Sequence, residues 1–172
     1  MLFSEVVAVR RRVLGPEHPN TLSSMHYLGV QLGTEHRYPE AERVFREVLE
    51  IQRRIIGPEH LDTLETMNDL GVTYANEHRY TEGEKVFREA ISIAREVLPY
   101  NQVTGRLFYN LACLEAVQSR REDALADLRQ AVDHGFRRRD SMATDEDLKS
   151  LHGDPRFNAV LAELQRSFPA VK

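Results

Sequence analysis

The side chains best suited to chemistry in this chain are seven histidines and one cysteine. A zinc-binding helix typically carries two histidines about four residues apart on one face, and no histidine pair here has that spacing. His18, His36, His60 and His78 instead recur at a fixed interval and fall in predicted turns. We therefore expect no metal site, because recurrence of a longer sequence accounts for these histidines.

A nucleophile is equally hard to find. Cys113, the only cysteine, lies beside Leu111 in a helical apolar pattern, which predicts a thiol in the core or lining a groove rather than a catalytic group. The chain has no glycine-rich phosphate loop, no Gly-x-Ser-x-Gly elbow and no kinase signature. The arginines at 137–139 fit a solvated turn better than a site for an anionic partner. We predict a protein that is not an enzyme and uses no cofactor.

The composition describes a globular chain without a strong charged field. Hydrophobic residues make up 41% of the 172 residues and charged residues 29%, with a formal net charge of -4. That balance argues against the basic surface of nucleic-acid-binding proteins. No apolar run approaches the roughly 18 residues of a membrane span, no positive leader precedes the first apolar residues, and a single cysteine suits a reducing compartment. We expect a cytoplasmic protein with no nucleic-acid or membrane partner.

The strongest signal is an internal repeat. The tetrapeptide Gly-Pro-Glu-His occurs twice, 42 residues apart, and residues 15–56 match 57–98 at 22 of 42 positions without a gap. A period of this length is typical of solenoids, in which each unit buries its apolar face only against its neighbours. Apolar residues at helical spacing predict two helices per repeat, over 19–35 and about 39–56 in the first.

The ends of these helices have their own signals. Pro19 fits the first turn of a helix, with Asn20 or Thr21 as the side-chain cap. His36 and His78 lie in the turn between the two helices of each repeat, where histidine can adopt the left-handed conformation at some strain.

Residues 2–14 align with 44–56 at the same interval and predict the second helix of an incomplete repeat. One apolar flank of this helix then lacks an intrachain partner. Either the chain is cut from a longer protein or another molecule covers the flank, and we expect homo-oligomerisation through this face. The apolar residues of the helix are Phe3, Val6, Val7, Val9, Val13 and Leu14.

The recurring residues resemble the tetratricopeptide repeat, in the 42-residue form of the kinesin light chain subclass. A third, degenerate unit follows, in which Asn110-Leu111-Ala112 supplies the Leu-small pair and the helix starts near Asn101 or Gln102. The closing segment resembles that of bacterial repeat proteins, including repeat regions that follow serine/threonine kinase domains. The matching residues are Leu28-Gly29, Leu70-Gly71, Arg37-Tyr38, Arg79-Tyr80, Ala41 and Phe45.

The resemblance implies an all-α fold, a right-handed α-solenoid of antiparallel helix pairs with C-terminal capping helices. Within the capping segment we predict a short helix after Thr144 and a last helix opened by Asp154 and Pro155, with an apolar face that includes Phe168. The expected organisation is the second helix of a truncated repeat at 1–14, repeats at 15–56 and 57–98, a degenerate repeat at 99–135 and capping helices at 136–172.

Helix geometry separates a core stripe from a groove-facing stripe on the first helix of each repeat. In the degenerate repeat the core stripe includes Glu115, an unusual core member. The groove-facing residues combine amides, aromatics and small apolar groups, which can satisfy a peptide backbone and contact its side chains. The predicted peptide-binding residues are Ser23, His26, Tyr27, Val30, Glu65, Asn68, Asp69, Val72, Asn76, Tyr109, Asn110 and Cys113.

The resemblance implies that asparagines at the positions of Asn68 and Asn110 help hold bound peptide. Tyr27 and Asp69 replace the asparagine often found beside the Leu-small pair, which indicates a different peptide preference. The lysine-rich pattern that clamps a terminal carboxylate in chaperone-binding relatives is absent, so a chaperone tail is not the expected partner.

We expect a scaffold for protein–protein interaction that binds a peptide or a partner helix in the concave groove. The chain would then suit the C-terminal accessory region of a larger signalling protein. The alternative is a ligand-binding or catalytic function in the non-repeat tail, residues 136–172, which is too short to hold a separate catalytic core.

Overall fold

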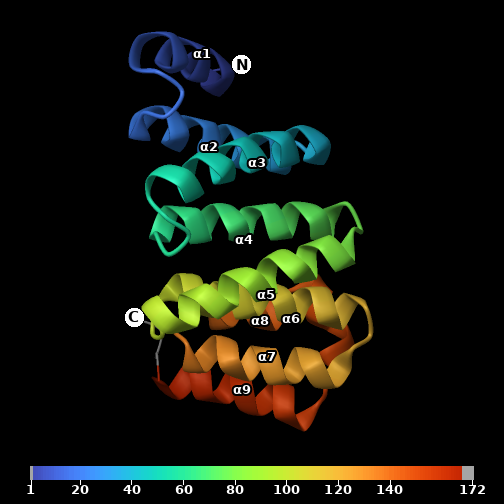
Figure 1. The fold of residues 1–172 in the computed structure, drawn as a ribbon. Helices are drawn as coiled ribbons and strands as arrows, with labels where there is room; N and C mark the ends of the chain where they lie inside the picture. Colours follow the sequence, from blue (N-terminus) through green and yellow to red (C-terminus); the bar gives the residue numbers. More distant parts are fainter. Residues whose placement is uncertain (1, 168–172) are drawn as a thin grey trace. The chain divides into compact units, whose positions relative to one another are not determined.

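The computed structural model describes residues 2–167, and every regular element within them is a helix (Figure 1). The prediction of an all-α chain without strands is confirmed for these residues, whereas Phe168 lies outside them. No described helix is long and apolar enough to cross a membrane. The helices are α1 (Leu2–Leu14), α2 (Pro19–Thr34), α3 (Tyr38–Ile55), α4 (Leu61–Asn76), α5 (Tyr80–Val97), α6 (Gln102–Val117), α7 (Arg121–Asp133), α8 (Arg139–Thr144), the 3-10 helix η1 (Glu146–Leu151) and α9 (Pro155–Ser167).

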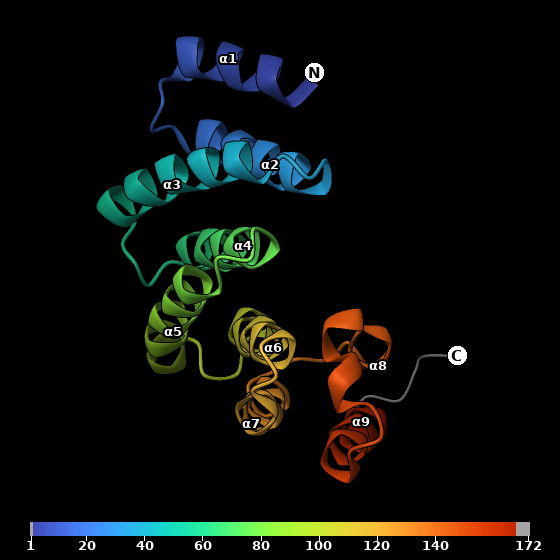
Figure 2. The same ribbon diagram turned by 90° about the vertical axis from the view of Figure 1, so that its right-hand side faces the viewer.

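The chain divides into two compact units, unit 1 (Met1–Val86) and unit 2 (Phe87–Lys172), with the boundary inside α5. In unit 1, α1 packs on α2, α2 on α3, and α3 on α4 (Figure 2). In unit 2, α6 and α7 form one closely packed helix pair, η1 lies on α6, and α9 lies on α7 and α8. The helices of unit 1 are thus stacked in chain order, whereas in unit 2 the C-terminal helices fold back onto α6 and α7.

The two Gly-Pro-Glu-His junctions fold alike. Gly15 and Gly57 end α1 and α3 with φ of 92° and 90°, a left-handed conformation that glycine adopts without steric cost. The ring Nδ1 of His18 then accepts a hydrogen bond from the backbone N–H of Asn20 at 3.2 Å, and His60 caps α4 in the same way. The expected cap at Asn20 or Thr21 was wrong, because the backbone is still extended at His18 and that ring reaches the first-turn amide.

The turns inside the repeats depend on histidines in the left-handed conformation. His36 and His78 have φ of 58° and 59°, as expected, and the corresponding turn of unit 2 uses Ser119 at 62°. Nδ1 of His36 lies 2.6 Å from the hydroxyl of Tyr38, so the side-chain contact helps to hold the strained residue. In unit 1 the histidine and the tyrosine two residues later therefore stabilise this turn together, whereas Ser119 and Arg121 occupy these positions in unit 2.

Two contacts show how the helices of unit 1 fit together. A Cβ atom on Gly29 would lie 2.6 Å from a ring carbon of buried Phe45, so α2 and α3 approach each other only because this position is glycine. Arg11 of α1 lies over α2 with Nη2 3.3 Å from the sulfur of Met25. The same contact recurs one repeat later between Arg53 of α3 and the sulfur of Met67 in α4, at 3.6 Å.

The outer face of α1 is apolar and exposed. Val7 packs into the core of unit 1 with Leu22 and Met25, whereas 67% of Val13 is exposed to solvent. The predicted apolar stripe of this helix is therefore only partly covered. Its exposed members are Phe3, Val9, Val13 and Leu14.

The C-terminal segment contains the predicted short helix after Thr144, which is η1, and one helix that was not predicted. Thr144 ends an additional helix, α8, and Asp145 caps η1 by accepting a hydrogen bond from the backbone N–H of Asp147 at 3.0 Å. The solvated turn expected at 137–139 is found at Arg137 and Arg138, which are exposed, and Arg137 also donates to the carbonyl oxygens of Val132 and Phe136, while Arg139 begins α8. The fully buried side chains of this segment make it part of the core of unit 2, and they are Met142, Leu148, Leu151, Phe157 and Leu164.

Candidate functional site

The predicted groove residues of unit 1 differ widely in their access to solvent. Tyr27 is the most open, at 56% exposed, whereas Asn68 is 2% exposed. Asn68 donates from Nδ2 to Oδ1 of Asp69 at 3.0 Å, so its amide belongs to the protein's own network. The exposed members are Ser23, Tyr27, Val30 and Asn76, and the half-buried members are His26, Glu65, Asp69 and Val72.

Four of these residues line one depression of about 290 Å³, here called the groove hollow. It lies where the N-terminal halves of α2 and α4 meet the C-terminal end of α3. Val30, Asn68, Asp69, Val72 and Asn76 are not among its lining residues. The lining residues are Pro19, Leu22, Ser23, His26, Tyr27, Gln52, Ile55, Ile56, His60, Asp62 and Glu65.

A close contact between α2 and α4 lies beside the hollow, at His26. Nε2 of His26 lies 2.9 Å from Oδ2 of Asp69, and the other carboxylate oxygen of Asp69 accepts from Asn68. The imidazole also lies edge-on to Tyr27, with ring centroids 6.0 Å apart. Asp69 and Asn68 thus act on the hollow through His26 rather than by contact with it.

The apolar wall of the hollow was only partly foreseen. Ile55 and Ile56, at the C-terminal end of α3, are 38% and 39% exposed although both are large aliphatic residues. Together with Leu22 they form a surface on which an apolar chain segment can pack. The sequence-based prediction placed the groove only on the first helix of each repeat, so it did not include these residues at the end of the second helix.

Gln52 is the polar residue that sequence reasoning missed. It lines the groove hollow and is 4% exposed, and within the described structure its side-chain oxygen Oε1 has no hydrogen-bond donor. A buried acceptor without a donor is costly and uncommon in native proteins. The signal was available, because the repeat places the small apolar residue Ala94 at the position that corresponds to Gln52.

In unit 2 the predicted groove residues are covered by the protein itself. Tyr109 is buried, stacks on Phe136 at a centroid distance of 4.3 Å, and donates its hydroxyl hydrogen to Oδ2 of Asp145. Cys113 is also buried, with Sγ 3.8 Å from the same oxygen, and only Asn110 is half-buried. The segment that leads into η1 therefore occupies this face of α6, which narrows the surface open to a partner.

The chemistry of Cys113 is that of an inert core thiol. Burial, with the nearby charges of Asp145 and Asp147 adding to it, raises the pKa of the thiol well above its usual value. The Cys113, Asp145 and Asp147 ligand atoms lie within 4.8 Å of one another. Both oxygens of Asp145 already accept hydrogen bonds from the protein, from Tyr109 and from the N–H of Asp147. Nothing else at this cluster points to a bound ion.

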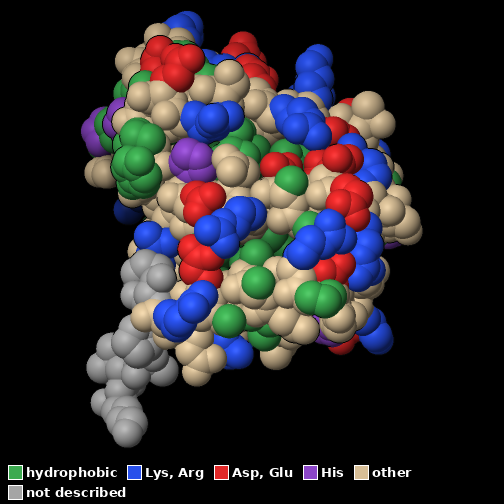
Figure 3. Space-filling view, turned by 90° about the horizontal axis from the view of Figure 1, so that it is seen from below, with side chains coloured by type: hydrophobic (Ala, Val, Ile, Leu, Met, Phe, Trp, Pro, Cys, Tyr) green, Lys and Arg blue, Asp and Glu red, His purple; other side chains and the backbone are tan. Residues whose placement is uncertain are grey.

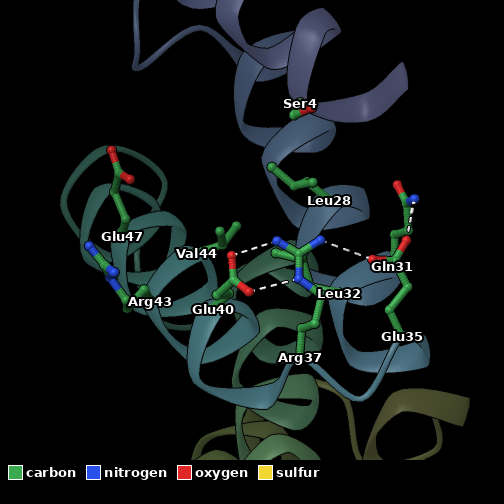
Figure 4. A pocket seen from close by; sticks show the side chains of 10 residues that line it. All are labelled: Ser4, Leu28, Gln31, Leu32, Glu35, Arg37, Glu40, Arg43, Val44 and Glu47. Atoms are coloured by element: carbon green, nitrogen blue, oxygen red, sulfur yellow. Dashed lines mark hydrogen bonds and ion pairs between the residues drawn. The ribbon is translucent and has the colours of Figure 1, made fainter. Parts of the chain in front are cut away.

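A second depression of unit 1, of about 360 Å³, lies on α1, α2 and α3 (Figure 4). Its centre is filled by side chains that bind one another. Arg37 makes ion pairs with Glu40 at 2.6 Å and with Glu35 at 3.1 Å, and Glu35 also accepts from Gln31 at 2.8 Å. The face of the molecule seen in Figure 3 likewise mixes basic and acidic side chains.

Comparisons with known proteins agree with the repeat pattern. Two family models, both described as the tetratricopeptide repeat, match residues 32–79 in one case and residues 2–20 and 63–102 in the other. The structure is similar to crystal structures of nearly identical TPR-like repeats from a Podosopora anserina protein provisionally named a kinesin light chain. One of these, at 18% identity, has a TM-score of 0.72 and covers 99% of this chain and 87% of that chain.

A single-substitution variant of the same repeats, also at 18% identity, has a TM-score of 0.73, with coverage of 96% of this chain and 82% of that chain. No curated protein matches the sequence. The similarity to the solved repeats extends over the fold, including the C-terminal segment that the repeat period does not reach.

Proposed function

Because the chain belongs to the tetratricopeptide repeat family, we propose that it is a protein–protein interaction scaffold that binds an extended peptide or a partner helix at the groove hollow of unit 1. Helical repeats of this kind typically serve as non-catalytic scaffolds whose stacked helices present a binding surface. The proposal includes a cytoplasmic location and a role as the accessory region of a larger signalling protein.

The observation that carries this proposal is the combination of an open apolar wall with a polar rim. Ile55 and Ile56 present apolar surface to solvent next to the exposed ring of Tyr27. Aromatic side chains with one polar end are enriched at the centres of protein interfaces. A hollow of this size matches one or two side chains of a bound segment, with Ser23 and His60 at its edge available for hydrogen bonds to the backbone.

The experiment is a selection of binders from a random dodecapeptide display library on the purified chain, followed by titration of the selected peptides. We expect Tyr27→Ala to weaken their binding by about tenfold or more, because an exposed aromatic anchor is lost. The unfolding midpoint should hardly change, because the side chain is 56% exposed. Tyr100→Ala, which removes a tyrosine of unit 2 that is 86% exposed, is the matched control.

Selected peptides that bind Tyr27→Ala and wild-type protein equally would place the binding surface elsewhere. A library that yields no binder to the folded chain would contradict the peptide-binding role.

A further inference from the structure

The carboxylates that line the groove hollow, one of which lies 3.9 Å from Nδ1 of His60, constrain the chemistry of the partner. Asp62 and Glu65 contribute carboxylates to its rim, and no lysine or arginine is among its described lining residues. The nearest arginine of α3 in sequence, Arg54, is held in an ion pair with Glu17 at 2.7 Å. An acidic segment would therefore meet repulsion here, and a basic one attraction.

The buried oxygen of Gln52 independently favours a ligand that carries a hydrogen-bond donor. Gln52 is 4% exposed and its Oε1 atom lacks a donor in the described structure, although the residue lines the hollow. A ligand that places an N–H group there would remove the cost of this unsatisfied acceptor. The apolar wall formed by Leu22, Ile55 and Ile56 requires that the same ligand carry a hydrocarbon stem.

We propose that the groove hollow takes an arginine side chain of the bound segment. The guanidinium donates to Oε1 of Gln52 and lies near the carboxylates of Asp62 and Glu65, while its stem covers the apolar wall. This inference deepens the proposed function, on which it rests, by naming the side chain that the site selects.

Arginine fits this site better than lysine. Its guanidinium has five N–H donors in one plane and is less strongly hydrated than an ammonium group, so it can reach a buried acceptor and surface carboxylates together. It can also stack on an exposed ring such as Tyr27. The same unit contains such a contact, because the guanidinium carbon of Arg79 lies 4.4 Å from the ring centre of Tyr74.

The test uses small probes so that it does not depend on finding the natural partner. N-acetyl-arginine N-methylamide is titrated into the full chain with isotope-labelled isoleucine and leucine methyl groups, alongside the corresponding lysine and norleucine compounds. We expect saturable shifts at the methyl groups of Leu22, Ile55 and Ile56, with Ile91 of unit 2 as the internal reference. The arginine compound should bind about tenfold more tightly than the uncharged norleucine compound.

Gln52→Met is the decisive variant, because methionine keeps the length of glutamine and removes the unsatisfied acceptor. The variant should fold with equal or greater stability than wild type. It should lose about tenfold in affinity for the arginine compound and leave the norleucine compound unaffected. Gln31→Met, at the other depression of unit 1, is the matched control and should change neither affinity.

Equal binding of the arginine and norleucine compounds, or an unchanged arginine affinity in Gln52→Met, would overturn the inference. Its failure can be told apart from that of the proposed function. Selected peptides whose binding depends on Tyr27 but that contain no arginine would contradict the arginine preference and support the peptide-binding function. If the arginine compound binds at the hollow but no library peptide does, the arginine preference would be supported and the peptide-binding function contradicted.

Discussion

Glu115 is a buried acid in the last turn of α6, at a position that the sequence pattern assigns to the core. The residue is 0% exposed, and its Oε1 atom accepts a hydrogen bond from Arg88 at 3.0 Å. Burial, with the negative charge of Asp127 adding to it, raises the pKa of Glu115 to about 8. The carboxyl group is therefore largely protonated in the folded chain at neutral pH.

This shift predicts a pH dependence of stability. The folded-state pKa of Glu115 lies above the usual value of 4.5, so the folded chain binds the proton more tightly and the free energy of unfolding falls as the pH rises from about 4.5 to about 8. Glu115→Gln removes this ionisation. The variant should be more stable than wild type by roughly 2–4 kcal/mol at pH 9, with a smaller difference at pH 5. Urea unfolding at several pH values measures the effect.

Glu96→Gln, on the exposed surface of α5, is the control for that series. Parallel stability profiles of wild type and Glu115→Gln between pH 5 and 9 would show that the buried carboxyl group does not titrate in this range.

Only some of the side chains at the site could be predicted from the sequence. Tyr27 and His26 could be found because helix geometry places them beside a core stripe whose period is clear. Tyr109 and Cys113 follow the same rule, yet the non-repeating segment folds over them, and a repeat pattern contains no information about what covers its last unit. The burial of Asn68 could not be predicted either, because the resemblance to a family identifies an equivalent position but not its exposure to solvent.

Three ion pairs join α7 to α9 in unit 2: Glu122 with Arg156, Arg129 with Glu163, and Arg121 with Asp154, the residue that also caps α9. Asp154 caps α9 by accepting a hydrogen bond from the backbone N–H of Arg156 at 2.7 Å, and it forms an ion pair with Arg121 of α7 at 2.7 Å. Hydrogen bonds from the Arg156 side chain and backbone, followed by that from Arg121, hold the pKa of Asp154 well below its usual value of 3.8. The cap predicted from sequence at Asp154 and Pro155 is confirmed.

Asp154→Asn should separate the charge from the cap, because asparagine is an equally good capping residue. The substitution should lower the free energy of unfolding at pH 7, because the partly exposed Arg121 and Arg156 lose the counter-charge of Asp154. A lowered folded-state pKa gives stability that is present above pH 3.8 and is lost as the pH falls further, so the difference from wild type should narrow in acid.

Thermal unfolding at pH 7 and at pH 3 measures this difference. Asp140→Asn, whose side chain is 95% exposed, is the control. An Asp154→Asn variant as stable as wild type at pH 7 would mean that the charge of Asp154 does not stabilise the contact between α7 and α9.

Helices of the repeats could be predicted because each has several apolar positions at regular spacing and a glycine or histidine at its end. The six-residue helix α8 has too few positions to show a period, so it was missed. The histidine caps were missed for a chemical reason. Histidine is an uncommon capping residue, and only the extended backbone at His18 and His60 brings the ring nitrogen to the first-turn amide.

For the molecule as a whole, the exposed flank of α1 predicts self-association. Val9 and Val13 are 50% and 67% exposed on a helix whose other face is in the core, and exposed apolar stripes tend to be covered by association. Light scattering should show a mass that rises with protein concentration, and the double variant Val9→Glu and Val13→Glu should remove the rise without loss of stability.

Val97→Glu, at an exposed valine of α5, is the matched control. A constant monomer mass at all concentrations, or the same rise in the double variant, would exclude this flank as the contact surface.

The contact between Arg11 and Met25, and its recurrence between Arg53 and Met67, also has a consequence for how such a chain can change over generations. Consecutive helix pairs meet through the same side chains, so a duplicated copy of residues 15–56 would find a matching surface on either side. Unequal recombination within the gene could then lengthen or shorten the array in a single event without inventing a new interface. Equivalent positions of two copies, such as Gln52 and Ala94, differ through later point substitutions, and these would then have to provide the difference in binding between copies.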